Sequence, residues 1–299
     1  WDCAPFGTTI GRALGFKVKL SPLSTRRIYE SGLQAVTSDT VCFPAKLVHG
    51  HIRSLVKSKV DRIFMPIITV VKSEGTSKTA ESMCAVVKGY PMVVHNSDNP
   101  EERWGVPFDC PLWHWYTSED RDRQLTKWMG EQFGIDAATV RRAVQLADAA
   151  QGSFRTQLQT RGVQVMEEVE AQGKYAVVLA SRPYQNDDLV NHDLPKIFNE
   201  LGVPVVTADS IPGIHTENLS HSLLDVVNNY HARMLSTALI AAKSEHLEYV
   251  QIVNFNCGHD AYLSDEIIRI MKETSGKAPL VLKVDESDIA GPLRIRVRS

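Results

Sequence analysis

The chain has 299 residues, longer than one average domain, so we expect two domains or one domain with a large insertion. Hydrophobic residues make up 43% of it, charged residues 23%, and the net charge is -2. These values exclude the basic footprint of a nucleic-acid-binding protein and the charged face of a membrane-surface protein. No apolar run approaches the roughly 20 residues of a membrane span.

The chain opens on Trp1 without an initiator Met or a signal peptide, and it stops in a basic stretch, so we expect a piece of a longer protein. Its five cysteines are an odd number, are scattered and include no C-x-x-C pair. A cytoplasmic, reducing location fits this pattern best. Any metal site therefore has to be assembled from distant segments.

The first part of the chain alternates between strand and helix patterns, which favours a parallel sheet and a first Rossmann-like lobe over residues 1–95. The expected elements, besides a helix after Cys42 and a brief one after Cys84, are a helix over Thr8–Leu14 and strands over Phe16–Leu20, Val60–Val71 and Met92–His95. Residues 96–173 are expected to be a connection up to Trp113 and then a helical linker. Asp136 is the predicted N-cap there, and the expected interruptions are Gly134, Gly152 and Gly162.

Residues 174–299 predict a second α/β lobe in which strands and helices alternate in a doubly wound order. The expected strands are Tyr175–Ala180, Val203–Thr207, Tyr249–Phe255 and Pro279–Val284, and the helices are one ending near Gly202, Asn228–Lys243 and Asp260–Thr274. The predicted fold class is α/β, with two Rossmann-like or flavodoxin-like lobes that have parallel sheets and are joined by a helical segment.

The stretch from Thr37 to Lys57 predicts a polar loop that carries Cys42 and a helix that begins directly after it. Phe43 and Pro44 occupy the first turn, where proline is tolerated because the N–H groups there have no partner within the helix. A thiol at this end of the helix dipole favours the thiolate, which binds metals or attacks electrophiles. Cys42 is therefore a candidate for chemistry, and a small buried residue at a helix start is the alternative.

Cys257 follows a predicted strand and precedes a helix, and Cys84 also lies ahead of a helical run. Ligands in open parallel sheets gather at the carboxyl ends of strands. Three thiolates brought together between two lobes would suit a cubane iron–sulfur cluster with one open or non-cysteine position. Thiolates are soft ligands for iron, and helix N-termini offset the negative charge of the cluster. Unconnected core cysteines are the alternative.

Zinc is a second metal that Cys42 and Cys257 would accept, together with His49, His51 or His259, because zinc binds mixed sulfur and nitrogen ligands. His49 and His51 are two positions apart on a helix, so they point about 200° apart and do not easily face one ion. We therefore expect one of them to be packed and the other solvated.

The loop Ser181–Asp187 follows a strand and precedes a helix, and it carries Arg182 and Tyr184 at the edge where a substrate would lie. Asp209, Asp285 and Glu286 are further strand-end carboxylates, and a simple helix cap is the alternative for each. The sequence has no Walker-type phosphate loop, no G-x-G-x-x-G after a strand and no G-x-S-x-G elbow. Nucleotide binding and serine hydrolysis are therefore unsupported.

Several segments together resemble one family: SDTVCFPAKLVHGHI, the Cys84 segment ending in Gly-Tyr-Pro, SRPYQNDDLVNHDLPKIFNELGVPVVTADSIP, FNCGHDAYLSDEI and LVLKVDE. The chain resembles the conserved region attached to, or encoded with, activators of 2-hydroxyacyl-CoA dehydratases. That region is itself similar to the dehydratase and benzoyl-CoA reductase subunits and to double-cubane cluster proteins. The resemblance runs in order over nearly the whole chain and is weakest in the helical middle.

The resemblance implies a protein of anaerobic, low-potential electron transfer. In the related subunits three cysteines hold a [4Fe-4S] cluster, and by position these match Cys42, Cys84 and Cys257. Cys3 and Cys110 match no ligand. The ATPase domain of the activator is not in this chain, so the chain alone should not hydrolyse ATP.

The chain also departs from the family at three places. The usual Gly-Arg-Pro-Tyr-His is Ser-Arg-Pro-Tyr-Gln at residues 181–185, which puts any role of the loop histidine in doubt. The usual proline after Cys-Gly is His259, and the proline often found after the second cysteine is Ala85.

We therefore predict a [4Fe-4S] cluster held by the three matching cysteines, with Arg182, Tyr184 and Asp260 beside it or facing a substrate. The expected partners are an activator ATPase module, on the same or a separate chain, and a dehydratase or reductase subunit. We expect neither nucleic acid nor membrane as a partner and leave a homodimer open. The alternatives are a catalytic subunit that dehydrates or reduces an acyl-CoA, and a cluster-free or zinc-bound module that docks partners.

Overall fold

The computed structural model describes residues 3–71, 81–226, 228–254, 256–287 and 290–298. Its N-terminal half comprises α1 (Ala4–Ala13), α2 (Arg26–Gly32), η1 (Leu33–Ala35), α3 (Phe43–Lys57), β1 (Ile63–Phe64), β2 (Ile67–Val71), α4 (Ala85–Ser97), α5 (Pro100–Trp104), β3 (Phe108–Asp109), β4 (Leu112–Trp115) and α6 (Ser118–Phe133). The long helix α7 (Ala137–Ala171) follows. The C-terminal half comprises β5 (Ala176–Ala180), η2 (Pro183–Asn186), α8 (Leu194–Glu200), β6 (Val205–Thr207), η3 (Ala208–Ser210), α9 (Asn229–Lys243), β7 (Leu247–Asn254), α10 (Gly258–Ser275), β8 (Leu280–Val284) and α11 (Ala290–Arg298).

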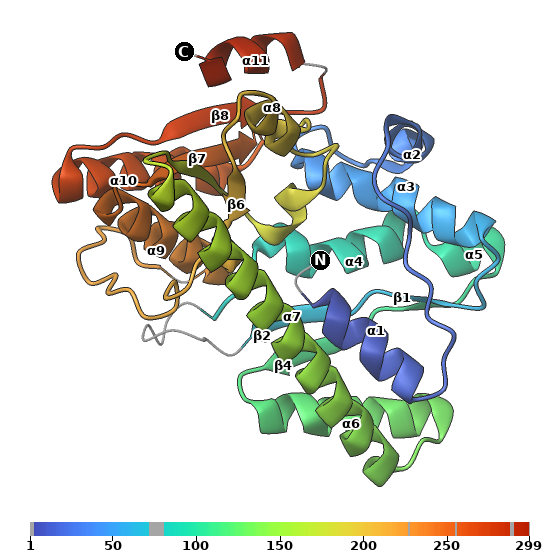
Figure 1. The fold of residues 1–299 in the computed structure, drawn as a ribbon. Helices are drawn as coiled ribbons and strands as arrows, with labels where there is room; N and C mark the ends of the chain where they lie inside the picture. Colours follow the sequence, from blue (N-terminus) through green and yellow to red (C-terminus); the bar gives the residue numbers. More distant parts are fainter. Residues whose placement is uncertain (1–2, 72–80, 227, 255, 288–289, 299) are drawn as a thin grey trace.

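The C-terminal half is built on a parallel sheet with the strand order β6-β5-β7-β8. Every residue of β5 is buried, which explains why this segment is continuously apolar. Val178 packs in one cluster with residues of α9 and α10, whereas Val177 and Leu179 pack in another with residues of α8 and α11. Helices therefore cover both faces of the sheet (Figure 1), and the predicted doubly wound α/β arrangement is confirmed.

The N-terminal half contains two small parallel sheets, in which β1 pairs with β3 and β2 pairs with β4. The single strand predicted over Val60–Val71 is wrong, because the segment divides between Phe64 and Ile67. Pro66 lies in this gap and has no N–H group to donate to a ladder. The strands β3 and β4 come from the stretch expected to be a plain connection, so that stretch completes both sheets.

Two other strand predictions are wrong. Phe16–Leu20 is not in a strand, and its apolar alternation is satisfied by packing, since the rings of Phe16 and Phe133 meet edge-on with centroids 4.9 Å apart. Met92–His95 belongs to α4, which continues through Pro91. Tyr90 and Val94 are four positions apart and both buried, so the spacing is that of one helix face.

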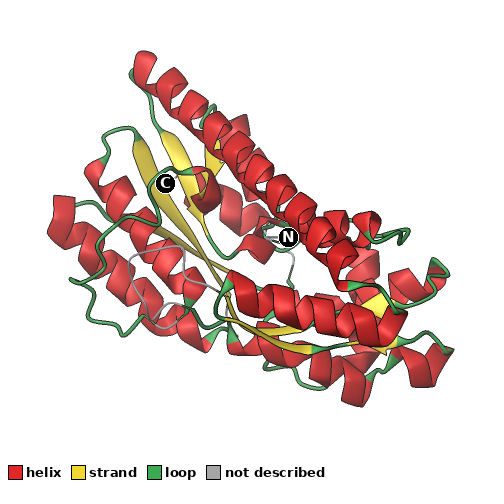
Figure 2. Ribbon diagram, turned by 90° about the horizontal axis from the view of Figure 1, so that it is seen from below, coloured by secondary structure: helices red, strands yellow, loops and turns green. Residues whose placement is uncertain are grey.

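The helix α7 has 35 residues and runs from α1 to the sheet of the C-terminal half, as Figures 1 and 2 show. Asp136 caps it as predicted, accepting hydrogen bonds from the N–H groups of Ala138 and Thr139. Gly134 ends α6 in the left-handed conformation. The interruptions expected at Gly152 and Gly162 are absent, because α7 continues through both residues. This long helix joins two α/β halves with small parallel sheets, so the predicted fold class is confirmed.

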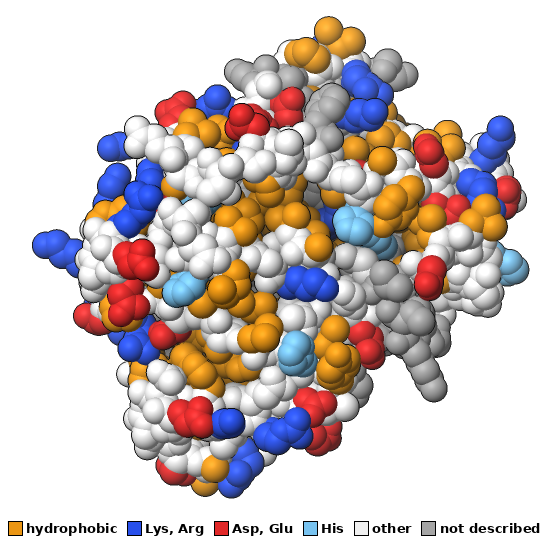
Figure 3. Space-filling view, turned by 180° about the vertical axis from the view of Figure 1, so that it is seen from behind, with side chains coloured by type: hydrophobic (Ala, Val, Ile, Leu, Met, Phe, Trp, Pro, Cys, Tyr) orange, Lys and Arg blue, Asp and Glu red, His pale blue; other side chains and the backbone are white. Residues whose placement is uncertain are grey.

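One face of the protein surface is mixed in character (Figure 3). Figure 3 shows acidic and basic side chains interspersed on one face, with hydrophobic side chains between them. Among the described residues, no helix combines the length and the apolar character that crossing a membrane requires.

At Gly162 the helix α7 lies close against η3, because a Cβ atom there would lie 2.1 Å from the carbonyl oxygen of Ser210. We predict that Gly162→Ala lowers the free energy of unfolding by about 1–3 kcal/mol, since the helix has to move away from its neighbour. Gly152→Ala is the matched control in the same helix, because a Cβ atom there meets nothing within 4 Å. It should stabilise the protein by about 0.5–1 kcal/mol. Urea unfolding of both variants checks this, and equal effects would contradict the close packing.

Candidate functional site

A small cavity lies where the carboxyl ends of β5 and β7 meet the starts of α3 and α4. Residues from both halves of the chain line it, and three of the five cysteines are among them. The lining residues are Cys42, Pro44, Cys84, Val86, Arg182, Tyr184, Gln185, Asn254, Asn256, Cys257, Gly258 and His259. The structure thus brings together three thiols that lie far apart in the sequence.

Each of the three thiols belongs to the residue that precedes a helix. Cys42 is the N-cap of α3, Cys84 is the N-cap of α4, and Cys257 is the N-cap of α10. The N-terminus of a helix carries unpaired N–H groups and the positive end of the dipole. Three such ends therefore converge on one cavity, which is an environment that favours negative charge.

Hydrogen bonds to the backbone hold the segments before the three cysteines in place. The side-chain amide of Asn256 donates to the carbonyl oxygens of Asp39 at 3.1 Å and Val41 at 3.3 Å, so it ties the loop before Cys42 to the loop before Cys257. The N–H of Asn229 donates to the carbonyl of Ser82 at 3.1 Å. This contact joins the segment before Cys84 to the start of α9.

A buried ion pair lies behind the cavity. A guanidinium nitrogen of Arg182 is 2.8 Å from Oδ1 of Asp260, and the two side chains are 2% and 0% exposed. The other carboxylate oxygen of Asp260 accepts from the N–H of Asn254 at 3.0 Å. Burial acts to lower the pKa of Arg182, but Tyr184, Asp260 and Cys257 raise it by more, so the guanidinium stays charged.

Two of the three thiols at the cavity, those of Cys42 and Cys257, have a raised pKa. Burial raises the pKa of Cys42 to about 11, against the opposing effect of the Ala45 N–H group. Burial also raises the pKa of Cys257, although the positive charge of Arg182 acts to lower it. Because only the thiolate binds metal, loading this site would release protons.

Two aromatic residues support His259 at the rim of the cavity. Its Nδ1 atom lies 2.5 Å from the hydroxyl oxygen of Tyr262, one turn along α10. The ring of His231, on α9, meets the ring of His259 edge-on with centroids 4.9 Å apart. Burial, together with the positive charge of Arg182, lowers the pKa of His231 to about 3, so this neighbour is neutral.

A second, much larger cleft of about 1080 Å³ lies between the two halves. Phe43 and Pro183 are in its wall, and each is next to a residue of the cysteine cavity, so the two spaces are neighbours. The cations of the cleft include Arg233, which is paired with Asp209, and Lys196, which is paired with Asp188 and Asp193.

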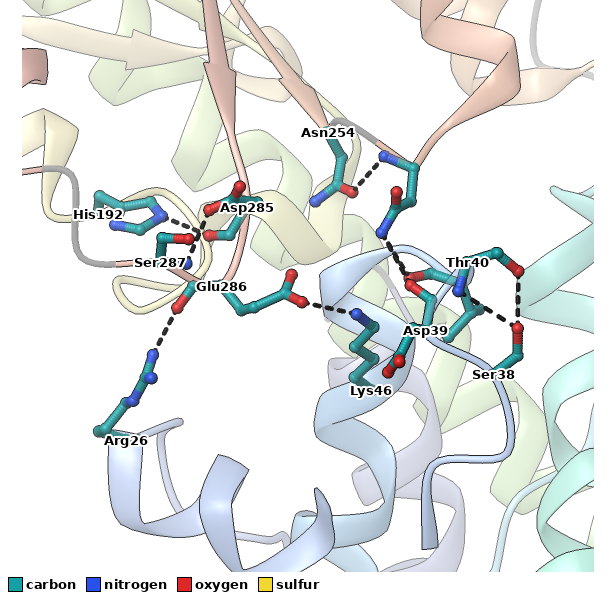
Figure 4. Close-up of polar contacts among 12 residues, drawn as sticks. Arg26, Ser38, Asp39, Thr40, Lys46, His192, Asn254, Asp285, Glu286 and Ser287 are labelled. Atoms are coloured by element: carbon teal, nitrogen blue, oxygen red, sulfur yellow. Dashed lines mark hydrogen bonds and ion pairs between the residues drawn. The ribbon is translucent and has the colours of Figure 1, made fainter. Parts of the chain in front are cut away.

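Contacts after β8 connect the two halves at this cleft. The ammonium of Lys46 is 2.7 Å from a carboxylate oxygen of Glu286, and Arg26 donates to the Glu286 carbonyl (Figure 4). The Lys46 side chain is 3% exposed, so this ion pair is largely withdrawn from solvent. Of the strand-end carboxylates expected from the sequence, Glu286 therefore joins the halves here.

The other candidate metal ligands lie elsewhere. His49 is buried between the carboxylate of Asp98 and the hydroxyl of Tyr90, at 3.1 Å from each, and His51 is hydrogen-bonded to Ser24. Across the described ranges, no group of three Cys, His, Asp or Glu side chains is placed to hold one metal ion. The zinc alternative therefore has no support in this part of the chain.

Sequence reasoning missed three residues of the site. Asn256 directly precedes Cys257 at a strand end, so the rule for parallel sheets would have pointed to it. Tyr262 lies one turn after His259, which is a helical spacing. His231 carries no local signal, because only the packing of α9 on α10 brings it to the site. Asp260 supports Arg182 from behind and does not line the cavity.

A family model described as CoA enzyme activase uncharacterised domain matches residues 1–211. The matched region contains Cys42, Cys84, Arg182 and Tyr184, whereas Cys257 lies beyond it. No curated protein matches the chain, and no solved structure does.

The raised pKa of Cys42 predicts how its alkylation depends on pH. In the metal-free protein, its rate with iodoacetamide should keep rising about tenfold per pH unit from pH 7 to about 9.5, since the thiolate is the reacting form. The alkylation rate of glutathione in the same tube should begin to level off near the ordinary pKa of its thiol. Mass spectrometry of the Cys42 peptide measures the slope, and levelling below pH 9 would contradict the assigned burial effect.

The contacts of Asn256 predict that Asn256→Ala loosens the loop before Cys42. Each lost hydrogen bond costs about 1 kcal/mol, so amide hydrogen exchange over residues 39–42 should speed up by roughly fivefold or more. Asn218→Ala is the control, because Asn218 accepts a hydrogen bond from the N–H of Ser220 within its own loop. Unchanged exchange in Asn256→Ala would show that the two loops are held by other contacts.

Proposed function

The chain belongs to the CoA enzyme activase uncharacterised domain family, and from this and the cysteine cavity we propose that it carries a [4Fe-4S] cluster for electron transfer in an activase system. The description of the family associates it with CoA enzyme activases. An activase of this kind would couple ATP hydrolysis to the electron transfer, and the present chain would receive or pass on the electron. The ATPase module is then its first partner, and a dehydratase or reductase subunit is the next.

The chemistry of the donor set carries this proposal. Cys42, Cys84 and Cys257 line one cavity, although no three potential ligands of the described residues are placed around a single ion. A cubane cluster binds each thiolate to a different iron, so its ligands lie farther apart than those of one ion. The arrangement therefore fits a four-iron cluster better than zinc, and these three cysteines would hold it.

The electrostatics of the cavity also suit a cluster. When bound, the cluster would supply a low-potential centre for one electron. The three helix N-termini and the guanidinium of Arg182 would offset the negative charge of the thiolates and of the added electron. The hydroxyl of Tyr184 stays protonated, because burial raises its pKa well above the ordinary value. Tyr184 can therefore donate a hydrogen bond toward sulfur.

The large cleft favours a second candidate function, that of a catalytic subunit acting on an acyl-CoA or another small substrate. Its volume of about 1080 Å³ is in the upper range for ligand sites, and it adjoins the cysteine cavity. Its cations Lys196 and Arg233 are already paired with carboxylates, which weakens the case for a phosphate-rich ligand. Electron transfer without catalysis therefore remains our first proposal.

Iron and acid-labile sulfide measurements test the proposal on protein reconstituted without oxygen. We expect about four irons per chain in the unaltered protein. Cys42→Ala, Cys84→Ala and Cys257→Ala should each lose most of this iron, because each removes a ligand. Cys110→Ala is the matched control and should keep it, since Cys110 is outside the cavity lining.

Two results would count against the proposal. If the unaltered protein takes up no iron, the electron-transfer function fails and a partner-docking module is left. If the three alanine variants keep their iron, the cavity is not the site. To separate the two functions, an acyl-CoA is added to the reduced protein, and a changed electron paramagnetic resonance spectrum favours the catalytic candidate.

A further inference from the structure

The large cleft between the two halves is lined by apolar side chains that the core does not use. Phe154 and Leu158 lie one turn apart on α7, and both line the cleft. Neither belongs to a hydrophobic core cluster of the described residues. Leu23, from the segment before α2, also lines the cleft and is 66% exposed. Packing of the fold therefore does not account for these three side chains.

Both halves of the chain add further apolar surface to the same cleft. Phe43 contributes from the N-terminal half, and Pro183, Leu189 and Ile214 contribute from the C-terminal half. A concave space of this size, lined mainly by apolar side chains with a few polar groups among them, is the usual form of a small-molecule site. The apolar walls indicate a ligand with an apolar body.

The charges of the cleft do not favour an anionic ligand. Its described lining contains four Lys or Arg side chains and five Asp or Glu side chains, so the carboxylates outnumber the cations. Lys196 is paired with Asp188 and Asp193, and Arg233 is paired with Asp209. A ligand with several phosphates would meet these carboxylates without a net positive field to offset the repulsion.

Two neutral amides in the lining are available for the polar groups of a ligand. Gln159 lies on α7, one residue after Leu158, and Asn186 lies in η2. Within the described part of the chain, neither side-chain amide makes a hydrogen bond. Each amide can both donate and accept, so together they would recognise uncharged groups such as carbonyls, amides or hydroxyls.

We propose that the cleft binds an uncharged, largely apolar small molecule, with its carbon skeleton against Phe154 and Leu158 and its polar groups at the two amides. This inference deepens the second candidate function and rests on it for the use of the cleft as a ligand site. Of the substrates left open there, it selects the uncharged small molecule over an acyl-CoA. Phe43 and Pro183 are each next to a residue of the cysteine cavity, so the bound molecule would lie beside that cavity.

A titration with Nile red, an uncharged dye that becomes fluorescent in apolar surroundings, tests the proposal on the metal-free protein. We expect a saturable rise in fluorescence that coenzyme A in large excess does not reverse. Leu158→Glu should weaken binding roughly tenfold or more, because the carboxylate would have to lie unpaired against an apolar ligand. Leu146→Glu is the matched control and should bind as the unaltered protein does. Leu146 is on the same helix and 58% exposed, but it is outside the cleft lining.

Three results would overturn the inference. They are a lack of saturable binding, equal affinity in the Leu158→Glu and Leu146→Glu variants, and displacement of the dye by coenzyme A. Should Leu158→Glu fold poorly, Phe154→Glu gives a second reading, because Phe154 is 44% exposed and a charge there should weaken binding in the same way. The titration needs no iron, so its failure is distinguishable from a failure of the protein to take up a cluster.

Discussion

The ion pair of Arg182 and Asp260 is the interaction on which the candidate site depends. It joins the end of β5 to the start of α10, and Asp260 also binds the backbone at the end of β7. Both side chains are withdrawn from water, so removal of either one would leave an uncompensated charge and cost about 3–5 kcal/mol. A cation is thereby fixed beside the three thiols at any pH at which the protein is folded.

Burial explains how the thiols of Cys42 and Cys257 can lie in one cavity without repelling each other, although Arg182 acts to lower the pKa of both. Three thiolates in one small cavity would repel one another, but burial keeps Cys42 and Cys257 protonated. If iron binds as proposed, it would replace those protons, and the helix N-termini and Arg182 would face the negative charge that develops. In the proposed metal-bound form, the protein's own dipoles and cation would thus offset the charge that protons offset otherwise.

The sequence predicted most of the C-terminal sheet and the start of α3, because a continuous apolar run and a first-turn proline are local signals. The predictions were wrong where tertiary contacts determine the secondary structure. The strand predicted at Met92–His95 is helical because Tyr90 and Val94 bury one helix face. The strands β3 and β4 are short and exist through pairing with β1 and β2. The three cysteines could be named from their positions before helices, but the contributions of Asn256 and His231 depend on packing between distant elements.

The cavity is also a product of the association between the two halves, because Cys42 and Cys84 come from one and Cys257 from the other. The contacts that join the halves are therefore contacts that set the separation of the thiols. Lys46 is 3% exposed and paired with Glu286, and a buried ammonium without that carboxylate would be costly. Separation of the halves would expose this charge, break the Asn256 contacts and move the thiols apart. The same interactions consequently stabilise the fold and hold the three thiols in place, so under the proposed function the stability of this protein would be tied to its capacity to bind a cluster.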